Sequence, residues 1–268
     1  MNIAILGAGN MGKAIIGGLK RAYGDDGRIV VWDEIAGALE GLGGAAESVE
    51  PCDWAASGFI PDAVIISVKP ADVSELLGSI APIIWERKLN FLTISVAAGV
   101  STASICEKIG GNARVCRVMP NTPALIGEGL SAYSLSDNCT PEDERLVERI
   151  FGACGEVLSV PENLMDAVTG LSGSGPAFVY SFIEALAEGG VGAGLPYAAA
   201  LDAAVQTVIG AARMVRVTSE HPSVLRSRVM SPGGTTVKGL QALERSAFKN
   251  AVMSAVTEAA AQSAKMGS

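Results

Sequence analysis

The sequence feature that most constrains the fold is the Gly-rich run near the amino end of the chain. In NIAILGAGNMGKAIIGGL, Gly7, Gly9 and Gly12 follow a short apolar segment (residues 2–6) and open a helical pattern. This strand–turn–helix context is typical of dinucleotide-binding domains. Gly7 permits the tight turn, Gly9 lets the backbone approach a pyrophosphate, and Gly12 lets the helix lie close to the strand. The alternative is a purely structural turn. The predicted cofactor contacts here are Gly7, Ala8, Gly9, Asn10, Met11 and Gly12.

Short apolar runs alternate with helical patterns up to about residue 160. Most of these runs carry apolar residues at consecutive positions, as strands covered on both faces require. The alternation predicts an α/β domain with a mostly parallel, doubly wound sheet of the Rossmann type. We predict strands at residues 2–6, 28–32, 63–68, 91–96, 113–119 and 129–135, and helices at residues 11–22, 36–42, 72–80 and 102–109.

The character of the chain changes after residue 161, where Ala-rich helical patterns replace the strand signal. Two helices are predicted on either side of 194–196, a short one after His221, and one long helix from about 235 to 264. Their faces carry few charges and many small residues, which favours intertwining with a second subunit over a stand-alone helical domain. We therefore predict a dinucleotide-binding domain at 1–161 and an all-α substrate-binding and dimerisation domain at 162–268.

The second predicted strand is followed by two acidic residues that bear on the choice of cofactor. Asp33 lies 21 residues after Gly12, where a carboxylate can accept hydrogen bonds from both ribose hydroxyls of NAD. Asp33 and Glu34 together repel a 2′-phosphate, and no arginine lies between Asp33 and Leu42 to hold one. We expect NADH to be favoured, with NADPH possible. The alternative is that Asp33 only caps the helix that follows.

Three further strand ends are expected at the same edge of the sheet, where ligands of such sheets bind. Small residues in SVAAGVS leave room for a flat nicotinamide ring, and two prolines stiffen VMPNTP. Lys69 either reaches a phosphate or points to solvent, and all three segments could instead be ordinary connections. The predicted cofactor contacts are Val68, Lys69 and Pro70, then Ala97, Ala98 and Gly99, then Met119, Pro120 and Asn121.

The chain offers little conventional acid–base machinery. Its single histidine, His221, precedes a proline in a polar stretch, which predicts a turn or helix start. The serines of GLSGSGPAF do not form the G-x-S-x-G elbow of a hydrolase, and Gly173 and Gly175 are expected to permit close helix contact. The five cysteines have no metal-site spacing, so we expect no metal. Reducing a carbonyl needs a proton donor, whereas reducing a protonated imine needs mainly correct placement of the substrate.

The segment SPGGTTVKGL predicts a receptor for a carboxylate. Its glycines expose the backbone, and the first-turn N–H groups of the following helix point at an anion. The helix-end field contributes about 0.3–2 kcal/mol, and each charge-assisted N–H bond about 1.5–3 kcal/mol. A threonine hydroxyl is then free to hydrogen-bond a substrate nitrogen. The alternative is a capping loop without a ligand.

The net charge of −8 argues against nucleic-acid or anionic-membrane partners, which require a basic surface. Apolar stretches are interrupted before they reach about 20 residues, so no transmembrane helix is expected. An odd number of cysteines without a recognisable signal peptide favours a reducing cytoplasm.

Several motifs together resemble the pyrroline-5-carboxylate reductase family. They are ILGAGNMGKAI, SVKP, SVAAGV, RVMPNTPALIGEG, LSGSGPAFVY and HPSVLRSRVMSPGGTTVKGLQALE. The resemblance implies reduction of 1-pyrroline-5-carboxylate to L-proline by NAD(P)H, and an obligate homodimer that often assembles into a decamer, a pentamer of dimers. It implies that Thr236 faces the ring nitrogen as the catalytic contact, and that many members favour NADPH, which Asp33 does not suit. The implied substrate contacts are Ser231, Gly233, Gly234, Thr235 and Thr236.

Two other readings remain open at this point. A related imine reductase or a β-hydroxyacid-dehydrogenase-like enzyme shares the two-domain plan, but the latter needs a lysine or similar donor on the first long helix of the second domain. Between Gly175 and Ala193 the only charged residues are Glu184 and Glu188. A non-catalytic dinucleotide sensor would have no use for an anion-receiving loop.

Overall fold

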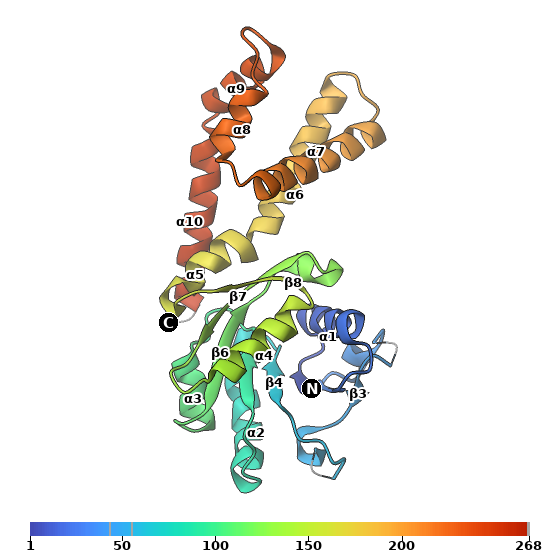
Figure 1. Cartoon of the computed structure of the whole chain (residues 1–268), viewed down its shortest axis with the longest axis vertical. Helices are drawn as coiled ribbons and strands as arrows, with labels where there is room; N and C mark the ends of the chain where they lie inside the picture. The colour runs from blue at the N-terminus through green and yellow to red at the C-terminus, as the bar shows by residue number, and fades with distance from the viewer. Residues whose placement is uncertain (43, 55, 267–268) are drawn as a thin grey trace. The chain divides into compact units, whose positions relative to one another are not determined.

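The computed structural model describes residues 1–42, 44–54 and 56–266, and its contacts divide the chain into two compact units (Figure 1). We call Met1–Ser174 together with the segment from Glu258 the sheet unit, and Gly175–Thr257 the helical unit. This division follows contacts within the chain, and the domain boundary predicted between residues 161 and 162 stays a prediction.

The sheet unit contains one eight-stranded sheet with the order β3-β2-β1-β4-β5-β6-β7-β8. All neighbouring strands are parallel except β6 and β7, so the predicted doubly wound sheet is confirmed. The strand order reverses between β1 and β4, which is the position where ligands of such sheets bind. The strands are β1 (Asn2–Leu6), β2 (Arg28–Trp32), β3 (Glu47–Ser48), β4 (Ala63–Ile66), β5 (Leu92–Ser95), β6 (Arg114–Met119), β7 (Gly129–Leu135) and β8 (Gly155–Ser159).

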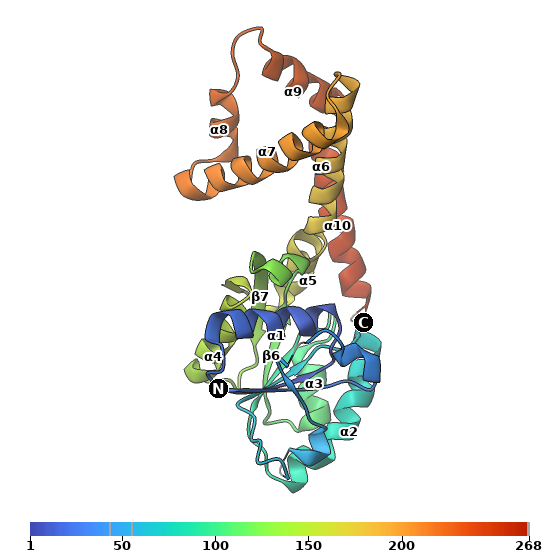
Figure 2. The same ribbon diagram turned by 90° about the vertical axis from the view of Figure 1, so that its right-hand side faces the viewer.

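Helices cover both faces of the sheet, because alternate strand residues feed two separate cores. Ile3 and Ile5 face the core formed with α1 (Asn10–Tyr23) and α4 (Pro141–Gly152). Ala4 and Leu6 face the core formed with α2 (Val73–Glu86) and α3 (Thr102–Ile109). Figure 2 shows α1 and α4 on one side of the strands and α2 and α3 on the other.

Several elements differ from the prediction. The sequence reading missed β3, β8 and α4, although α4 begins with a capping box between Thr140 and Asp143. The helix predicted at 36–42 is only a short 3₁₀ turn, η1 (Ala36–Leu39). The helix predicted to stop at residue 80 continues through Pro82, because Ile80 before the proline and Ile84 after it pack in the same core.

The helical unit contains α6 (Gly175–Gly192), α7 (Tyr197–Thr218), α8 (Pro222–Arg228), α9 (Thr235–Arg245) and the first part of α10 (Phe248–Met266). The single long helix predicted from 235 to 264 is wrong, since the chain breaks at Ala247, whose φ is +52°. Beyond that break, the Phe248 ring packs on Phe182 with ring centroids 5.8 Å apart. A tertiary contact therefore decides where the helix ends.

The helical unit buries little of its apolar surface within this chain. Its buried core is a small cluster of alanines, Ala187, Ala200 and Ala204. Many large apolar side chains remain exposed, among them Tyr180, Tyr197, Ile209, Met214, Val217, Val229 and Met253. On length and composition alone, α7 is the one helix of the described ranges that could cross a bilayer, and only 11% of its apolar window is buried.

Between β8 and the helical unit lies a short helical segment that belongs to the sheet unit. It consists of the 3₁₀ turn η5 (Glu162–Leu164), the single turn α5 (Met165–Val168) and the π-helical turn η6 (Thr169–Gly173). The end of α10 returns to this segment, where the Ser263 hydroxyl donates a 2.7 Å hydrogen bond to Asp166.

Candidate active site

The Gly-rich turn between β1 and α1 has the geometry that a pyrophosphate site requires. Gly7 has a φ of +105°, and a Cβ on it would come within 2.6 Å of the Ser67 carbonyl group. A Cβ on Gly12 would collide with the carbonyl oxygen of Gly7. The space beside Gly9 is open, because no atom lies within 4 Å of a Cβ built on it. Gly9 is the N-cap of α1, and no side chain caps the helix there. The free N–H groups at the start of α1 are therefore open to an anion.

A pocket of about 470 Å³ lies beside this turn. Asp33 stands at its wall, where Oδ2 accepts a 2.7 Å hydrogen bond from the Ala8 N–H and Oδ1 a 2.9 Å bond from the Ile35 N–H. Asp33 therefore ties the Gly-rich turn to the end of β2, and its carboxylate still has lone pairs for a ligand. The lining residues are Gly7, Gly9, Trp32, Asp33, Glu34, Ile35, Ala38, Ser67, Val68, Lys69, Asp72, Glu75, Leu76 and Ser79.

The charged residues around this pocket are mostly acidic. Four carboxylates and one ammonium group line it, so the local field is negative. Asp33, Glu34 and Lys69 were noticed in the sequence, but Asp72 and Glu75 were missed. Asp72 precedes α2 and Glu75 lies in its first turn, so neither directly follows a strand as Asp33 does, and no local signal marked them.

A buried hydroxyl group at the floor of the Gly-rich turn also fits a bound dinucleotide. Ser67 lines the pocket, and its Oγ is buried without a hydrogen-bond partner. Its Oγ lies 3.5 Å from the position that a Cβ on Gly12 would take. A buried polar atom without a partner is costly, and a ligand that reaches this turn can supply one.

The second group of predicted cofactor contacts lies at the ends of two neighbouring strands. β5 and β6 pair in parallel with Ser95 opposite Arg117, so Ala97–Gly99 and Met119–Asn121 leave the sheet at the same edge. Ala97 and Gly99 are buried, and Gly99 turns the chain with a φ of +78°. Ala97 and Gly99 therefore do not project from the surface at this edge of the sheet.

The amide of Asn121 is engaged within the protein. Its Oδ1 accepts a 2.9 Å hydrogen bond from the Leu130 N–H, and its Nδ2 lies 3.2 Å from both the carbonyl oxygen and the Oγ of Ser172. The sequence reading placed this amide beside the nicotinamide and gave no sign of the contact with Ser172, which is 51 residues away.

In the helical unit, the loop at residues 231–236 presents backbone groups as predicted from its composition. Gly233 has a φ of +70°, and the Gly234 N–H donates a 2.9 Å hydrogen bond to the Ser231 carbonyl. A Cβ on Gly234 would collide with the Ser231 hydroxyl, so a larger residue there would displace that side chain. Because α9 starts at Thr235 without a side-chain cap, its first N–H groups are free to bind an anion.

Among the described residues, no histidine or cysteine lines the pocket beside the Gly-rich turn. The single histidine, His221, caps α8 by accepting a 3.2 Å hydrogen bond from the Ser223 N–H, which confirms its structural role. Burial raises the pKa of the Cys154 thiol to about 11 and holds the pKa of the Cys116 thiol well above its usual value. Both thiols therefore stay protonated at neutral pH.

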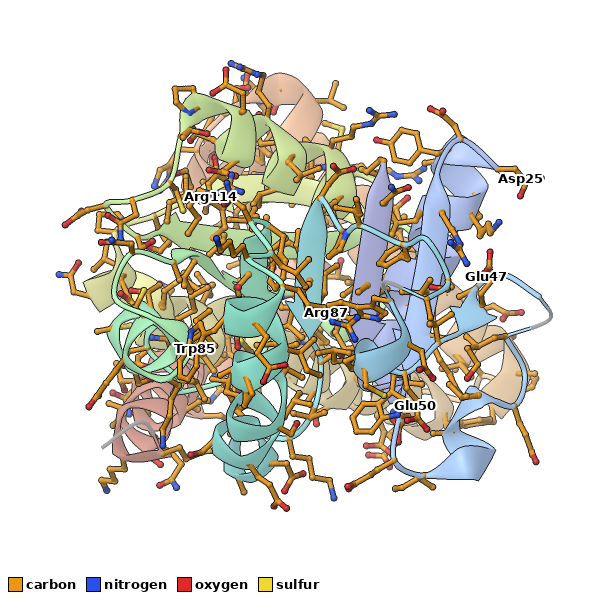
Figure 3. All side chains as sticks on the ribbon, turned by 90° about the horizontal axis from the view of Figure 1, so that it is seen from below. Asp25, Glu47, Glu50, Trp85, Arg87 and Arg114 are labelled. Carbon is orange, nitrogen blue, oxygen red and sulfur yellow. The ribbon has the colours of Figure 1, made fainter. Side chains whose placement is uncertain are left out.

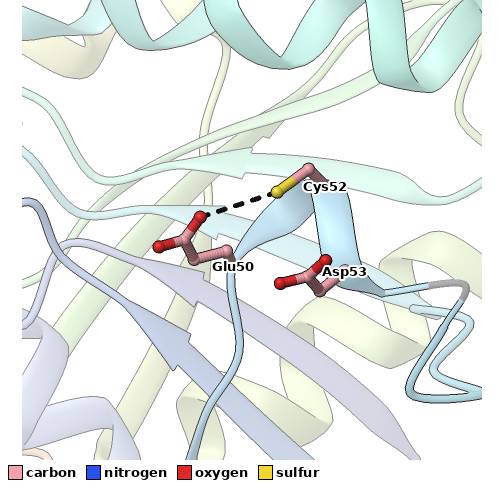
Figure 4. Close-up of side chains that lie close together, drawn as sticks. All are labelled: Glu50, Cys52 and Asp53. Atoms are coloured by element: carbon pink, nitrogen blue, oxygen red, sulfur yellow. Dashed lines mark hydrogen bonds between the residues drawn. The ribbon is translucent and has the colours of Figure 1, made fainter.

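Within the described residues, one group of side chains has metal-ligand character (Figure 4). The ligand atoms of Glu50, Cys52 and Asp53 lie within 4.8 Å of one another, and all three residues are exposed. Desolvation and the neighbouring carboxylates raise the pKa of the Cys52 thiol, which disfavours the thiolate that a metal would need.

A second pocket, of about 410 Å³, lies where β5 and β6 begin, at the edge opposite to the Gly-rich turn. Trp85 and Arg114, labelled in Figure 3, form part of its wall. The Trp85 N–H donates to the Ile109 carbonyl at 2.8 Å, and Arg114 pairs with Asp143 at 2.5 Å. Their polar groups are thus already satisfied.

Comparison with family models divides the chain in two. Residues 162–266 match the model described as pyrroline-5-carboxylate reductase dimerisation. Residues 2–99 match the model described as NADP oxidoreductase, coenzyme F420-dependent. The second match covers the Gly-rich turn and its pocket.

Known proteins match the whole chain. The pyrroline-5-carboxylate reductase of Escherichia coli is 38% identical, with 98% of this chain and 97% of that protein covered. That of Synechocystis is 38% identical over 100% of this chain and 98% of the relative. Among solved structures, the enzymes of Coxiella burnetii (TM-score 0.89) and Plasmodium falciparum with NADP bound (TM-score 0.87) are each 31% identical and cover 100% of this chain and 98% of theirs.

Proposed function

Because the chain belongs to the pyrroline-5-carboxylate reductase family, we propose a residue-level account of its reaction, the reduction of 1-pyrroline-5-carboxylate to L-proline with NAD(P)H. Full-length relatives at 38% identity carry this activity in their names, so a more distant imine reductase or a β-hydroxyacid-dehydrogenase-like enzyme is not favoured.

The dinucleotide binds across the Gly-rich turn and along the carboxyl edge of the sheet. When bound, NAD(P)H supplies the hydride. The N–H groups at the start of α1 hold the pyrophosphate, and the Ser67 hydroxyl, now without a partner, lies beneath them. The proposed contacts are Gly7, Ala8, Gly9, Asn10, Met11, Gly12 and Asp33, then Val68, Lys69 and Pro70, with Ala97, Ala98, Gly99, Met119 and Pro120 toward the nicotinamide. Asn121, also predicted as a contact, borders this group, but its amide is engaged by Leu130 and Ser172.

NADH is the favoured cofactor, although the Plasmodium relative was solved with NADP bound. The support is the acidic lining of the pocket: Asp33, Glu34, Asp72 and Glu75 line it, and Lys69 is the one cation among the described lining residues. A 2′-phosphate adds about −2 charges at neutral pH, and repulsion by these carboxylates disfavours it. Ribose hydroxyls, in contrast, can donate hydrogen bonds to Asp33.

The loop at 231–236 receives the substrate carboxylate. It carries no ionisable side chain, so the backbone N–H groups of Gly234, Thr235 and neighbouring residues act as the donors. The turn held between Ser231 and Gly234 fixes these groups before the substrate arrives, which lowers the entropic cost of binding. Ser231 and Gly233 complete the proposed carboxylate site.

Thr236 orients the ring through its hydroxyl, which hydrogen-bonds the ring nitrogen. A protonated imine carbon is already electrophilic, and the arriving hydride neutralises the cation. The reaction therefore needs no side chain that moves a proton during hydride transfer, in agreement with the absence of a histidine or thiolate base. The main contribution of the protein is orientation, which can lower a barrier by about 7–11 kcal/mol.

The helical unit forms the interface of a homodimer, and dimers assemble further into a decamer in the cytoplasm. The match to a dimerisation model over residues 162–266 supports a homo-oligomer. The exposed apolar side chains of α6, α7 and α10, including those of the α7 window, support burial by a second copy rather than by lipid. All five cysteines are free, which suits a reducing compartment.

A steady-state assay with 1-pyrroline-5-carboxylate and each cofactor tests this account. We expect oxidation of the cofactor with formation of proline, and a higher kcat/KM with NADH than with NADPH. Turnover without proline formation would contradict the reaction, and a higher kcat/KM with NADPH would contradict the proposed role of the acidic lining.

A further inference from the structure

Three alternate residues of β6 and its continuation hold the helical segment at 162–173 against the sheet. Arg117 lies 3.8 Å from Glu162 and 3.5 Å from Asp166, measured between guanidinium nitrogens and carboxylate oxygens. The Met119 methyl group touches Gly173, where a Cβ would come within 2.7 Å of it. Asn121 then binds Ser172. Side chains at i, i+2 and i+4 of an extended chain share one face, so the row is continuous.

The amino-terminal part of this row is an ionic network around a buried arginine, whose carboxylate partners are partly exposed. Arg117 is 8% exposed, and its partner Glu162 also accepts hydrogen bonds from the backbone and hydroxyl of Thr102, at 2.8 and 2.6 Å. Asp166 accepts the hydroxyl of Ser263 on α10. These contacts join β6, the segment at 162–166, α3 and the end of α10 within the sheet unit.

The other end of the row, at Asn121, holds a π-helical turn. In η6 the Ser174 N–H donates to the Thr169 carbonyl at 2.9 Å, an i→i+5 bond. π turns are rare and occur frequently at functional sites. Asn121 is suited to hold such a turn because one amide both accepts from the Leu130 N–H and donates to Ser172.

We propose that Asn121 is a positioning residue for hydride transfer, which fixes the π-helical turn at 169–173 against the nicotinamide edge of the sheet. Asn121 directly follows Met119 and Pro120, at the strand end where the nicotinamide is held. The contact of Asn121 with Ser172 therefore lies beside the nicotinamide, where a small displacement of the 169–173 turn changes the distance between the cofactor and the substrate. This inference rests on the proposed function, because it assumes that the nicotinamide lies at this edge.

The test is the single-turnover rate of hydride transfer, followed as the loss of NADH fluorescence with the full-length enzyme in excess. Asn121→Ala should lower this rate constant by about 10- to 100-fold, because a misplacement near 1 Å costs that much. The amplitude and the Kd of NADH should stay near the wild-type values. Deuterated NADH identifies the observed step as hydride transfer. Ser172→Ala, which retains the carbonyl acceptor, should give a smaller decrease.

The matched control is Asn138→Ala. Asn138 donates to the carbonyls of Gly111 and Ala113, at 3.2 and 3.4 Å, where β6 begins. It makes the same kind of bond at the other end of the strand, so its loss should leave the rate constant unchanged. Asn121→Asp keeps the acceptor for Leu130 but lacks the donor for Ser172, and should resemble Asn121→Ala.

Other results would overturn the inference. A purely structural role predicts a lower amplitude with an unchanged rate constant, and a direct cofactor contact predicts a raised Kd of NADH with the rate constant retained. If Asn121→Ala does not fold, an unchanged rate constant in Ser172→Ala contradicts the inference. A wild-type enzyme without proline formation would overturn the proposed function and this inference with it, whereas an active wild type with unaffected variants would overturn this inference alone.

Discussion

The hydroxyl of Thr236 is the side-chain group that the proposed chemistry depends on most. Thr236 lies in the first turn of α9, directly after the glycines that open the loop. The backbone amides of the loop can hold a carboxylate but do not distinguish the ring nitrogen from carbon. In the proposed site, the Thr236 hydroxyl is therefore the group that sets the orientation of the ring.

Thr236→Ala should lower kcat by up to about tenfold, because one hydrogen bond contributes about 0.5–1.5 kcal/mol. The Kd of NADH should not change, since the cofactor contacts lie in the sheet unit. Thr236→Ser keeps the hydroxyl and should recover most of the rate. If Thr236→Ala had the same kcat as the wild type, the proposed hydrogen bond from Thr236 to the ring nitrogen would be contradicted.

Asp33 should control the choice between the two cofactors. Asp33→Ser retains an oxygen to accept the Ala8 N–H but removes the charge, so kcat/KM should fall for NADH and rise for NADPH. Asp137→Ser is the matched control, because Asp137 is an exposed acid on the β7–α4 connection, away from the pocket. An unchanged ratio of the two kcat/KM values in Asp33→Ser would show that the acidic lining does not select the cofactor.

Sequence reading at the residue scale succeeded where backbone geometry dictates the residue. Gly7 and Gly233 both have a positive φ, as expected of turn glycines. It failed where contacts are distant in the chain: the bond of Asn121 to Ser172 and the acidic contributions of Asp72 and Glu75 have no local signature. Periodicity and turn chemistry report only on near neighbours.

At the scale of elements, the packing of α1 shows how glycines serve the fold rather than the ligand. Gly18 is buried where α1 meets the start of β8, and a Cβ there would lie 2.5 Å from the Cys154 sulfur and 2.9 Å from the Ala153 carbonyl oxygen. Gly17, on the same helix, has only the flexible end of Arg21 nearby, at 3.3 Å. Gly17 and Gly18 therefore form a matched pair: both lie in α1, but only Gly18 is closely packed against another element.

Gly18→Ala should destabilise the protein by about 1–3 kcal/mol through overpacking. Gly17→Ala should be neutral or stabilising by up to about 1 kcal/mol, because alanine favours helix. Urea unfolding at one fixed protein concentration measures both. Equal midpoints for the two variants would contradict the close approach of α1 to Cys154.

Elements were predictable where hydrophobic periodicity is strong and local. β1, β2, β7 and α3 have the predicted bounds. The break between α9 and α10 was not predicted, because SAFKN contains no proline or glycine and the contact of Phe248 with Phe182 is distant in sequence. The edge strand β8 was missed because it is half exposed and lacks a continuous apolar run.

At the scale of the whole molecule, the helical unit is incomplete as a single copy. Large apolar side chains on α7 are exposed, including Val205, Ile209 and Met214, while its only buried residues are alanines. An apolar surface of this extent marks an interaction site. The match of residues 162–266 to a dimerisation family model supports burial of this surface in a homo-oligomer.

The protein should therefore elute as a dimer or larger oligomer, with a mass at least twice 27.3 kDa by light scattering. Ile209→Glu should lower that mass, because a buried unpaired charge is costly. Gln206→Glu adds the same charge on the same helix at an already polar position and should leave the mass unchanged. A monomeric wild type would contradict the proposed interface.

Capture of a carboxylate by uncharged backbone groups at residues 231–236 is the central feature of the proposed site. Its most direct test compares kcat/KM for 1-pyrroline-5-carboxylate with that for 1-pyrroline, which is the same ring without the carboxylate. Losing two charge-assisted hydrogen bonds at about 1.5 kcal/mol each should lower kcat/KM by at least about a hundredfold. Equal values for the two rings would contradict it.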